Sequence, residues 1–167
     1  DIAMHLLGAG RSTRRTLDLD VSVALENWEQ YSHLTALLLQ HDFLKSPEKQ
    51  RFKYIGKHPY EYEVDIVPFG VMAKHDQVAW PPDEPPVMSV RCFEDVMRTA
   101  DTVHVDDLFS FRIASLSGQF LIKLDTWFDR HNLTKREAVD MVFFLQNVYV
   151  VYALTRTELP PEIDVDA

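Results

Sequence analysis

Cysteine is nearly absent from this sequence, since Cys92 is the only one among 167 residues. An intramolecular disulfide is therefore excluded, and with it any fold that depends on disulfide cross-links. Such scarcity is typical of proteins in a reducing compartment, so we predict a cytoplasmic protein. We interpret Cys92 itself as a small packed side chain rather than a nucleophile.

Long apolar runs are also missing. Stretches such as Met141–Leu145 are far too short to cross a bilayer, so no membrane partner is expected. The seven histidines lack the spacing of zinc ligands, and no Ser-His-Asp order or nucleophile elbow occurs. These absences argue against a zinc site and against a serine hydrolase.

Positive charge is also scarce: the chain has 17 basic and 26 acidic side chains, for a net charge of −9. A protein that holds a long nucleic acid by its phosphates usually has the opposite balance. Basic residues are concentrated in two short clusters, Arg11, Arg14 and Arg15 in one and Lys49, Arg51, Lys53 and Lys57 in the other. A small phosphorylated ligand suits this composition better than a long duplex.

The first part of the chain reads as helix, strand, helix and a strand pair. Residues 1–7 resemble a helix tail, closed by the glycines that follow. Strict alternation over residues 17–25 predicts a half-buried strand, and residues 27–43 have the apolar spacing of an amphipathic helix. Two further strands, 51–55 and 60–67, are separated by a turn and predict an antiparallel pair that ends at Pro68.

The second part becomes helical. The proline-rich segment 80–86 predicts a loop, followed by a short helix at 93–99 and a short strand at 102–105. Helical spacing then starts at Ile113, and a second helix over 135–152 opens with a Thr134–Glu137 capping box. The fold class is α+β: a small mixed or antiparallel sheet flanked by helices, followed by a C-terminal helical hairpin. We expect residues 1–110 to form the core and residues 111–167 a helical part packed on it as a single compact unit.

Two carboxylates on the first strand carry the chemical signal. Asp18 and Asp20 are one residue apart, so both project from the same face of the strand. Like charges this close are costly unless a cation lies between them, and Mg²⁺ prefers such oxygen ligands. A lone Asp-x-Asp also fits a solvated strand face. Two further features favour a metal and phosphate site. Asp65 lies on a second strand between apolar residues, and a basic turn that contains glycine precedes Asp18.

These residues resemble a known family. The string from Arg14 to Asp20 (RRTLDLD) is similar to the Arg-x-Thr-x-Asp-hydrophobic-Asp signature of nucleotidyltransferases with the polymerase-beta-like fold, in particular the AbiEii-like branch that includes toxins of type IV toxin–antitoxin systems. The segment 64–70 is similar to that branch's third-carboxylate strand, and residues 121–130 with Asp140 to its downstream helical motif. The chain departs from the family at Arg136-Glu137, where Lys-Asp is common.

The resemblance implies a nucleotidyltransferase-type sheet and a two-metal site. Asp18 and Asp20 would bind both Mg²⁺ ions and Asp65 would complete the shell of the catalytic one. Binding of the nucleoside triphosphate (NTP) would involve four further positions: Gly8, Arg14, Thr16 and Lys123. The expected activity is transfer of a nucleoside monophosphate from the NTP to a hydroxyl acceptor, with an antitoxin protein as a possible partner.

Several alternatives stay open at the level of sequence. The acceptor could be an RNA end, a protein side chain or a small molecule. The cleft could instead belong to a catalytically silent nucleotide-binding or protein-interaction module, and the same carboxylates could serve metal-dependent phosphoester hydrolysis. Individual residues also have ordinary interpretations: Lys123 as a solvent-reaching side chain, Arg130 at a helix C-terminus, Glu137 as a cap and Asp140 as a surface group.

The basic turn gives a first testable prediction. Arg14 is in phase with Asp18 and Asp20 if the strand extends back, whereas Arg15 is not. Arg14→Ala should therefore weaken NTP binding more than Arg15→Ala, as measured by calorimetric titration. Equal and negligible effects of the two substitutions would contradict the assignment.

Overall fold

The structure is a computed structural model that describes residues 18–57, 61–82, 84–105 and 107–155. It is a mixed α+β fold with small sheets and a C-terminal pair of helices, as the sequence predicts. The chain divides into two compact units, which we call the N-terminal unit (within Thr16–Glu94) and the C-terminal unit (from Asp95 onward). In the described part of the chain, no helix has both the length and the apolar character needed to cross a membrane.

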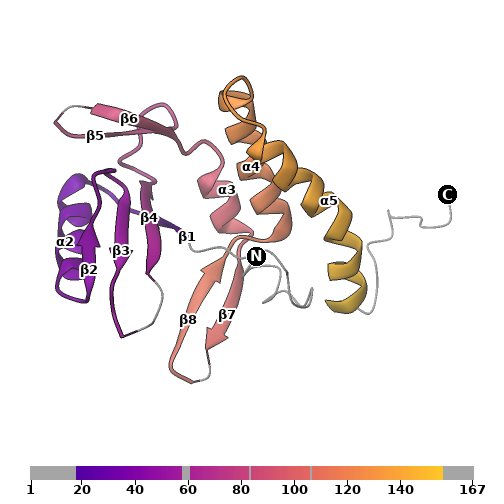
Figure 1. Ribbon diagram of the computed structural model, residues 1–167, viewed down its shortest axis with the longest axis horizontal. Helices are drawn as coiled ribbons and strands as arrows, with labels where there is room; N and C mark the ends of the chain where they lie inside the picture. Colours follow the sequence, from indigo (N-terminus) through magenta and orange to yellow (C-terminus); the bar gives the residue numbers. More distant parts are fainter. Residues whose placement is uncertain (1–17, 58–60, 83, 106, 156–167) are drawn as a thin grey trace. The chain divides into compact units, whose positions relative to one another are not determined.

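A four-stranded mixed sheet forms the centre of the N-terminal unit (Figure 1). Its strand order is β1-β4-β3-β2. β1 pairs with β4 in parallel, whereas the other neighbours are antiparallel. The strands span Asp18–Ala24 (β1), Phe43–Lys45 (β2), Arg51–Tyr54 (β3) and Tyr62–Phe69 (β4).

Helix α2 (Trp28–Leu39) covers one face of this sheet. It begins where the side chain of Asn27 accepts a hydrogen bond from the backbone N–H of Gln30 at 3.0 Å, which satisfies a donor of the first turn. Tyr31 lies in the core beside Ile66 and donates a hydrogen bond to its carbonyl oxygen at 3.4 Å. Burial raises the pKa of Tyr31. The predicted helix end at 43 was too late, because Phe43 already belongs to β2.

Strand β4 continues past the point where the sequence predicted its end. The prediction that Pro68 ends the strand was wrong, because pairing with β1 extends to Phe69. The backbone N–H of Ile66 donates to Gln50 on the β3 side at 2.8 Å. Two residues on, the Pro68 nitrogen faces the same side of β4. The antiparallel β3 does not reach this far, because its pairing with β4 stops at Arg51. The proline therefore costs the sheet no hydrogen bond.

The structure also corrects the prediction for the proline-rich segment. Residues 80–86 were predicted to be a loop, but they contribute to a hairpin of β5 (Gln77–Trp80) and β6 (Glu84–Ser89). The register shifts between Ala79, which pairs with Val87, and Trp80, which pairs with Glu84. The two prolines at 85 and 86 fall within that irregularity, where regular ladder bonds are not required.

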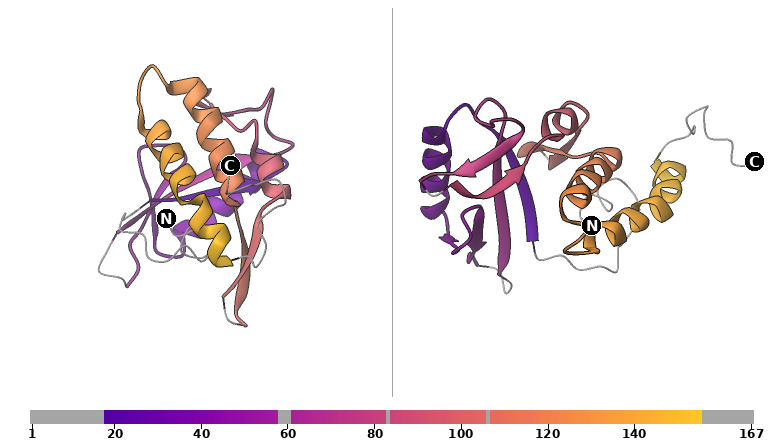
Figure 2. Two further views of the ribbon diagram at one scale, coloured as in Figure 1. Left: turned by 90° about the vertical axis from the view of Figure 1, so that its right-hand side faces the viewer. Right: turned by 90° about the horizontal axis from the view of Figure 1, so that it is seen from above.

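The C-terminal unit consists of a hairpin and a helix pair (Figure 2). Helix α3 (Phe93–Arg98) leads into β7 (Asp101–Val105) and β8 (Phe109–Ile113), and α4 (Leu116–Arg130) and α5 (Arg136–Thr155) follow. The sequence missed β8 and placed the helix start at Ile113. Ile113 suits both patterns: it follows Phe109 and Phe111 in strand alternation and precedes Leu116 by one helical turn.

Phe52 is the most deeply buried of the core aromatics, with 0% exposure. The Lys45 ammonium lies 4.0 Å from the centre of its ring, and burial lowers the pKa of that lysine. Phe52→Ala should lower the free energy of unfolding by about 3–5 kcal/mol, because a large cavity replaces the ring. Urea unfolding measures the loss. Leu44→Ala, at a side chain that is 52% exposed on the neighbouring strand, is the control and should cost less than about 1 kcal/mol; equal losses would contradict this account of the core.

Candidate functional site

The pairing of β1 with β4 brings the predicted carboxylates together on one sheet face. Asp20 is the register partner of Asp65, and Asp18 is the partner of Glu63. Paired residues of neighbouring strands project to the same side, so all four carboxylates share a face. Val64 and Ile66 alternate with them and lie in the core, on the face that α2 covers. Val67 and Phe69, which continue the carboxylates' side of β4, are buried as well. We call these four residues the carboxylate face.

Arg51 on β3 contacts the centre of the carboxylate face. It is the register partner of Asp65 and holds both of its oxygens, with Nε 2.7 Å from Oδ1 and one terminal nitrogen 2.9 Å from Oδ2. Its other terminal nitrogen lies 3.0 Å from Glu63 Oε2. The hydrogen bond with Asp65 raises the pKa of Arg51 further above its ordinary value. Paired donors of this kind make the strong, oriented form of carboxylate contact.

The sequence placed Arg51 in a basic cluster and missed this contact. The predicted antiparallel strand pair could have indicated this contact. A register that places Arg51 opposite Asp65 also places Lys53 opposite Glu63, so two basic residues pair with two acidic ones. Sequence alone does not fix that register, since it depends on the exact length of the turn. The Lys53 ammonium itself lies 4.0 Å from Glu61 Oε2.

The donor set suits a hard divalent cation in kind. Carboxylate oxygens on adjacent strands are the ligands that Mg²⁺ prefers. The third predicted ligand, Asp65, is instead engaged by Arg51 through both oxygens. Within the described ranges, no three or more acidic, histidine or cysteine side chains stand together as a ready metal cluster. A cation that used Asp65 would therefore have to compete with a guanidinium.

The predicted phosphate-binding residues divide between described and undescribed parts of the chain. Gly8, Arg14 and Thr16 lie outside the described residues, as does the predicted helix over residues 1–7. Lys123, on α4, is described and belongs to the C-terminal unit. Its ammonium lies 2.9 Å from Asp140 Oδ2 on α5.

A second ion pair joins the same two helices. Arg130, near the end of α4, donates to Glu137 Oε1 at 2.9 Å. Glu137 and Asp140 are both buried, at 4% and 7% exposure, so the two basic side chains neutralise carboxylates in the hairpin. The predicted capping box is realised in part: the Thr134 hydroxyl accepts from the Arg136 N–H at 3.1 Å, while the carboxylate of Glu137 turns to Arg130.

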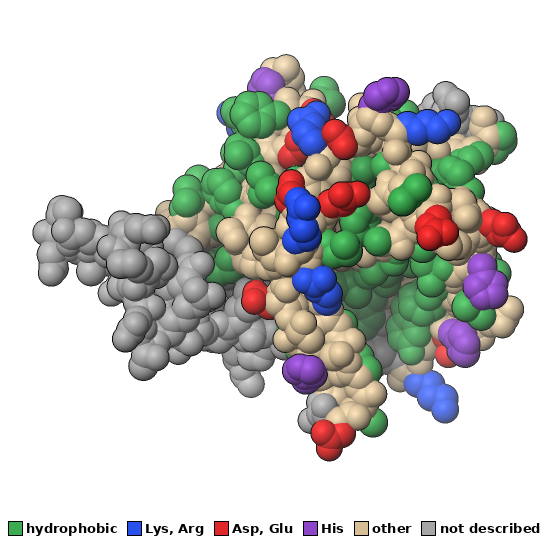
Figure 3. All heavy atoms as spheres, turned by 180° about the vertical axis from the view of Figure 1, so that it is seen from behind, with side chains coloured by type: hydrophobic (Ala, Val, Ile, Leu, Met, Phe, Trp, Pro, Cys, Tyr) green, Lys and Arg blue, Asp and Glu red, His purple; other side chains and the backbone are tan. Residues whose placement is uncertain are grey.

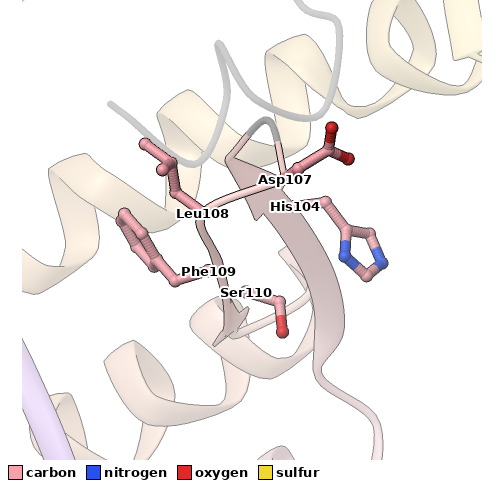
Figure 4. A pocket seen from close by; sticks show the side chains of 5 residues that line it. All are labelled: His104, Asp107, Leu108, Phe109 and Ser110. Atoms are coloured by element: carbon pink, nitrogen blue, oxygen red, sulfur yellow. The ribbon is translucent and has the colours of Figure 1, made fainter.

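A shallow cavity of about 290 Å³ lies at the turn of the β7–β8 hairpin (Figure 4). The polar side chains His104 and Asp107 line it, but Leu108 and Phe109 point away from them. A reactive site needs polar groups that converge on one point. This cavity therefore does not compete with the carboxylate face as a candidate site.

Charges of both signs are intermixed over the visible surface. In Figure 3, acidic and basic side chains of the described residues lie next to one another rather than in patches of one sign. The described residues on this face thus form no patch of one sign that would steer a long polyanion.

Among known proteins, neither a family model nor a curated protein matches this chain. The resemblance to nucleotidyltransferases thus stays a prediction.

The Lys123–Asp140 pair gives a prediction that separates a structural role from phosphate binding. Lys123→Met should lower the free energy of unfolding by about 2 kcal/mol, because a buried carboxylate loses its lysine. The value is below that of a fully buried pair because the Lys123 side chain is 33% exposed. Urea unfolding measures it, and adding Asp140→Asn should recover most of the loss.

The matched control for that experiment is Arg98→Met. Arg98 pairs with Asp95 on the surface, with side chains 70% and 61% exposed, so its loss should cost less than about 0.5 kcal/mol. A Lys123→Met variant as stable as the Arg98→Met variant would contradict the structural role.

Proposed function

We propose that this chain is a metal-dependent nucleotidyltransferase that moves a nucleoside monophosphate from an NTP to a hydroxyl acceptor. The observation that carries the proposal is the register of β1 on β4, with Asp20 beside Asp65 and Asp18 two residues back on the same face. Three aspartates on one face of two adjacent strands would supply hard oxygen ligands. Under this proposal the four-stranded sheet is of the nucleotidyltransferase type.

Each residue has a defined part in the proposed reaction. Asp18, Asp20 and Asp65 would hold two Mg²⁺ ions, which supply charge stabilisation at the phosphates and a more acidic attacking hydroxyl. Gly8 and Thr16 would bring backbone and hydroxyl donors to the triphosphate, and Arg14 a neutralising charge. Catalysis would then consist mainly of positioning and of electrostatic stabilisation of an in-line displacement.

Under this proposal, Lys123 can bind phosphate only if phosphate displaces its carboxylate partner. By the family resemblance this lysine would bind phosphate, yet its charge is engaged by Asp140. Phosphate would have to compete with a buried carboxylate for the ammonium. The acceptor is an RNA end, a protein side chain or a small molecule, and a toxin with a cognate antitoxin is the biological role that the resemblance favours.

One observation supports a second candidate, a catalytically silent nucleotide-binding or protein-interaction module. A silent protein would have little reason to keep aspartates that only repel one another. Arg51 supplies such a reason for Asp65, because the two form a paired contact that is useful without any metal. The presence of Asp65 therefore does not by itself favour the enzyme.

Substitution of the β1 aspartates separates the two candidates. Asp18→Asn and Asp20→Asn each remove one charged ligand of the proposed metal site while keeping the size of the side chain. The increase in melting temperature on adding Mg²⁺ and NTP should disappear, because that increase comes from ligand binding to the native state. Transfer of label from NTP should vanish in the same variants.

Asp129→Asn serves as the control, since it removes one exposed charge from α4 without touching the sheet. It should keep both the melting response and the transfer. A wild-type protein whose melting temperature ignores Mg²⁺ and NTP together would overturn the enzyme in favour of the protein-interaction module.

A further inference from the structure

The guanidinium of Arg51 is bound where a cation that used Asp65 would have to bind. Both Asp65 oxygens accept from it, at 2.7 and 2.9 Å. From these contacts we propose that Arg51 is a built-in counter-ion of the carboxylate face, which holds Asp65 in the metal-free state and must leave it before a divalent cation can bind there. This inference rests on the proposed function, because it assigns a regulatory step to the same site.

Charge, rather than a shortage of lone pairs, sets the competition. A carboxylate has about four acceptor positions, and Arg51 uses two of those on Asp65. A divalent ion bound to the remaining ones would lie within a few ångströms of a guanidinium that stays charged at any ordinary pH. Two cations that close repel strongly at a partly buried site, and the Asp65 side chain is only 15% exposed. One of the two must therefore move.

The structure also provides Arg51 with a second carboxylate partner. Its second partner, Glu63, is two residues back on β4 and already contacts it at 3.0 Å. The Glu63 side chain is 40% exposed and that of Arg51 is 28% exposed, so neither is locked in a packed core. Arg51 can keep Glu63 and release Asp65 by a side-chain movement, without any change in the sheet.

The consequence is a cation affinity lower than three aspartates alone would give. Metal binding includes the cost of breaking the paired contact, so the competent state is only a fraction of the metal-free population. Asp65 would then stay paired until a cation arrives in sufficient concentration or together with a negatively charged nucleotide.

Removal of the guanidinium tests the inference directly. Mn²⁺ binding without nucleotide should be measured by calorimetry for wild type, Arg51→Gln and Arg51→Lys. We expect Arg51→Gln to bind Mn²⁺ about tenfold more tightly, and Arg51→Lys about threefold, since lysine keeps the charge but loses the paired geometry. Arg51→Lys also covers the case in which Arg51→Gln does not fold.

Lys53→Gln is the matched control, because it removes a positive charge from the same strand and the same face. It should change the affinity by less than about twofold, since its ammonium is 4.0 Å from Glu61 and does not hold Asp65. A second readout follows the contact itself: the Nε–H resonance of Arg51, assigned by its loss in Arg51→Lys, should shift when wild type is saturated with Mg²⁺.

The outcomes separate this inference from the proposed function. If wild type transfers nucleotide but Arg51→Gln binds Mn²⁺ no more tightly than wild type or Lys53→Gln, the inference is overturned and the enzyme stands. If wild type is inactive and binds no Mn²⁺ while Arg51→Gln binds it, the inference holds and the enzyme is overturned. If wild type is inactive and no variant binds Mn²⁺, both are overturned.

Discussion

The parallel pairing of β1 with β4 is the constraint on which the candidate site depends. Residues far apart in sequence meet only through this pairing, which sets Asp20 beside Asp65. The register is fixed from the other side of the sheet, where Val64 and Ile66 pack under α2. A slip by one residue would exchange these apolar side chains with the carboxylates and bring the carboxylates into the core. The free energy of core burial therefore also holds the charged groups in place.

That coupling explains why acidic side chains accumulate on a stable sheet. Asp18, Asp20, Glu63 and Asp65 share one face, and Arg51 lies against two of them. Without a cation such a face would be destabilised by repulsion. Arg51 supplies a positive charge that offsets part of this repulsion.

How much of this the sequence could predict depends on the range of each contact. Alternation over β1 and helical spacing over α2 are local, and they predicted both elements and the shared direction of Asp18 and Asp20. The Arg51–Asp65 contact depends on the register across a turn, which no local pattern fixes. The β6 prolines were misread because a register shift admits residues that a regular ladder excludes. The partner of Asp140 likewise required the packing of α4 on α5.

Arg51 and Lys123 illustrate one physical limit on inferring function from charged residues. Each is a cation that a family resemblance or a basic cluster associates with phosphate, and each is engaged by a carboxylate of its own unit. The two differ in what release would cost. Asp140 is buried, so a Lys123 that left it would take a positive charge away from a buried carboxylate. Arg51 has Glu63 as an alternative partner on an accessible face. A cation with two carboxylate partners can exchange between them, whereas one that neutralises a buried carboxylate is held in place, and this difference makes Arg51 the residue suited to respond to a ligand.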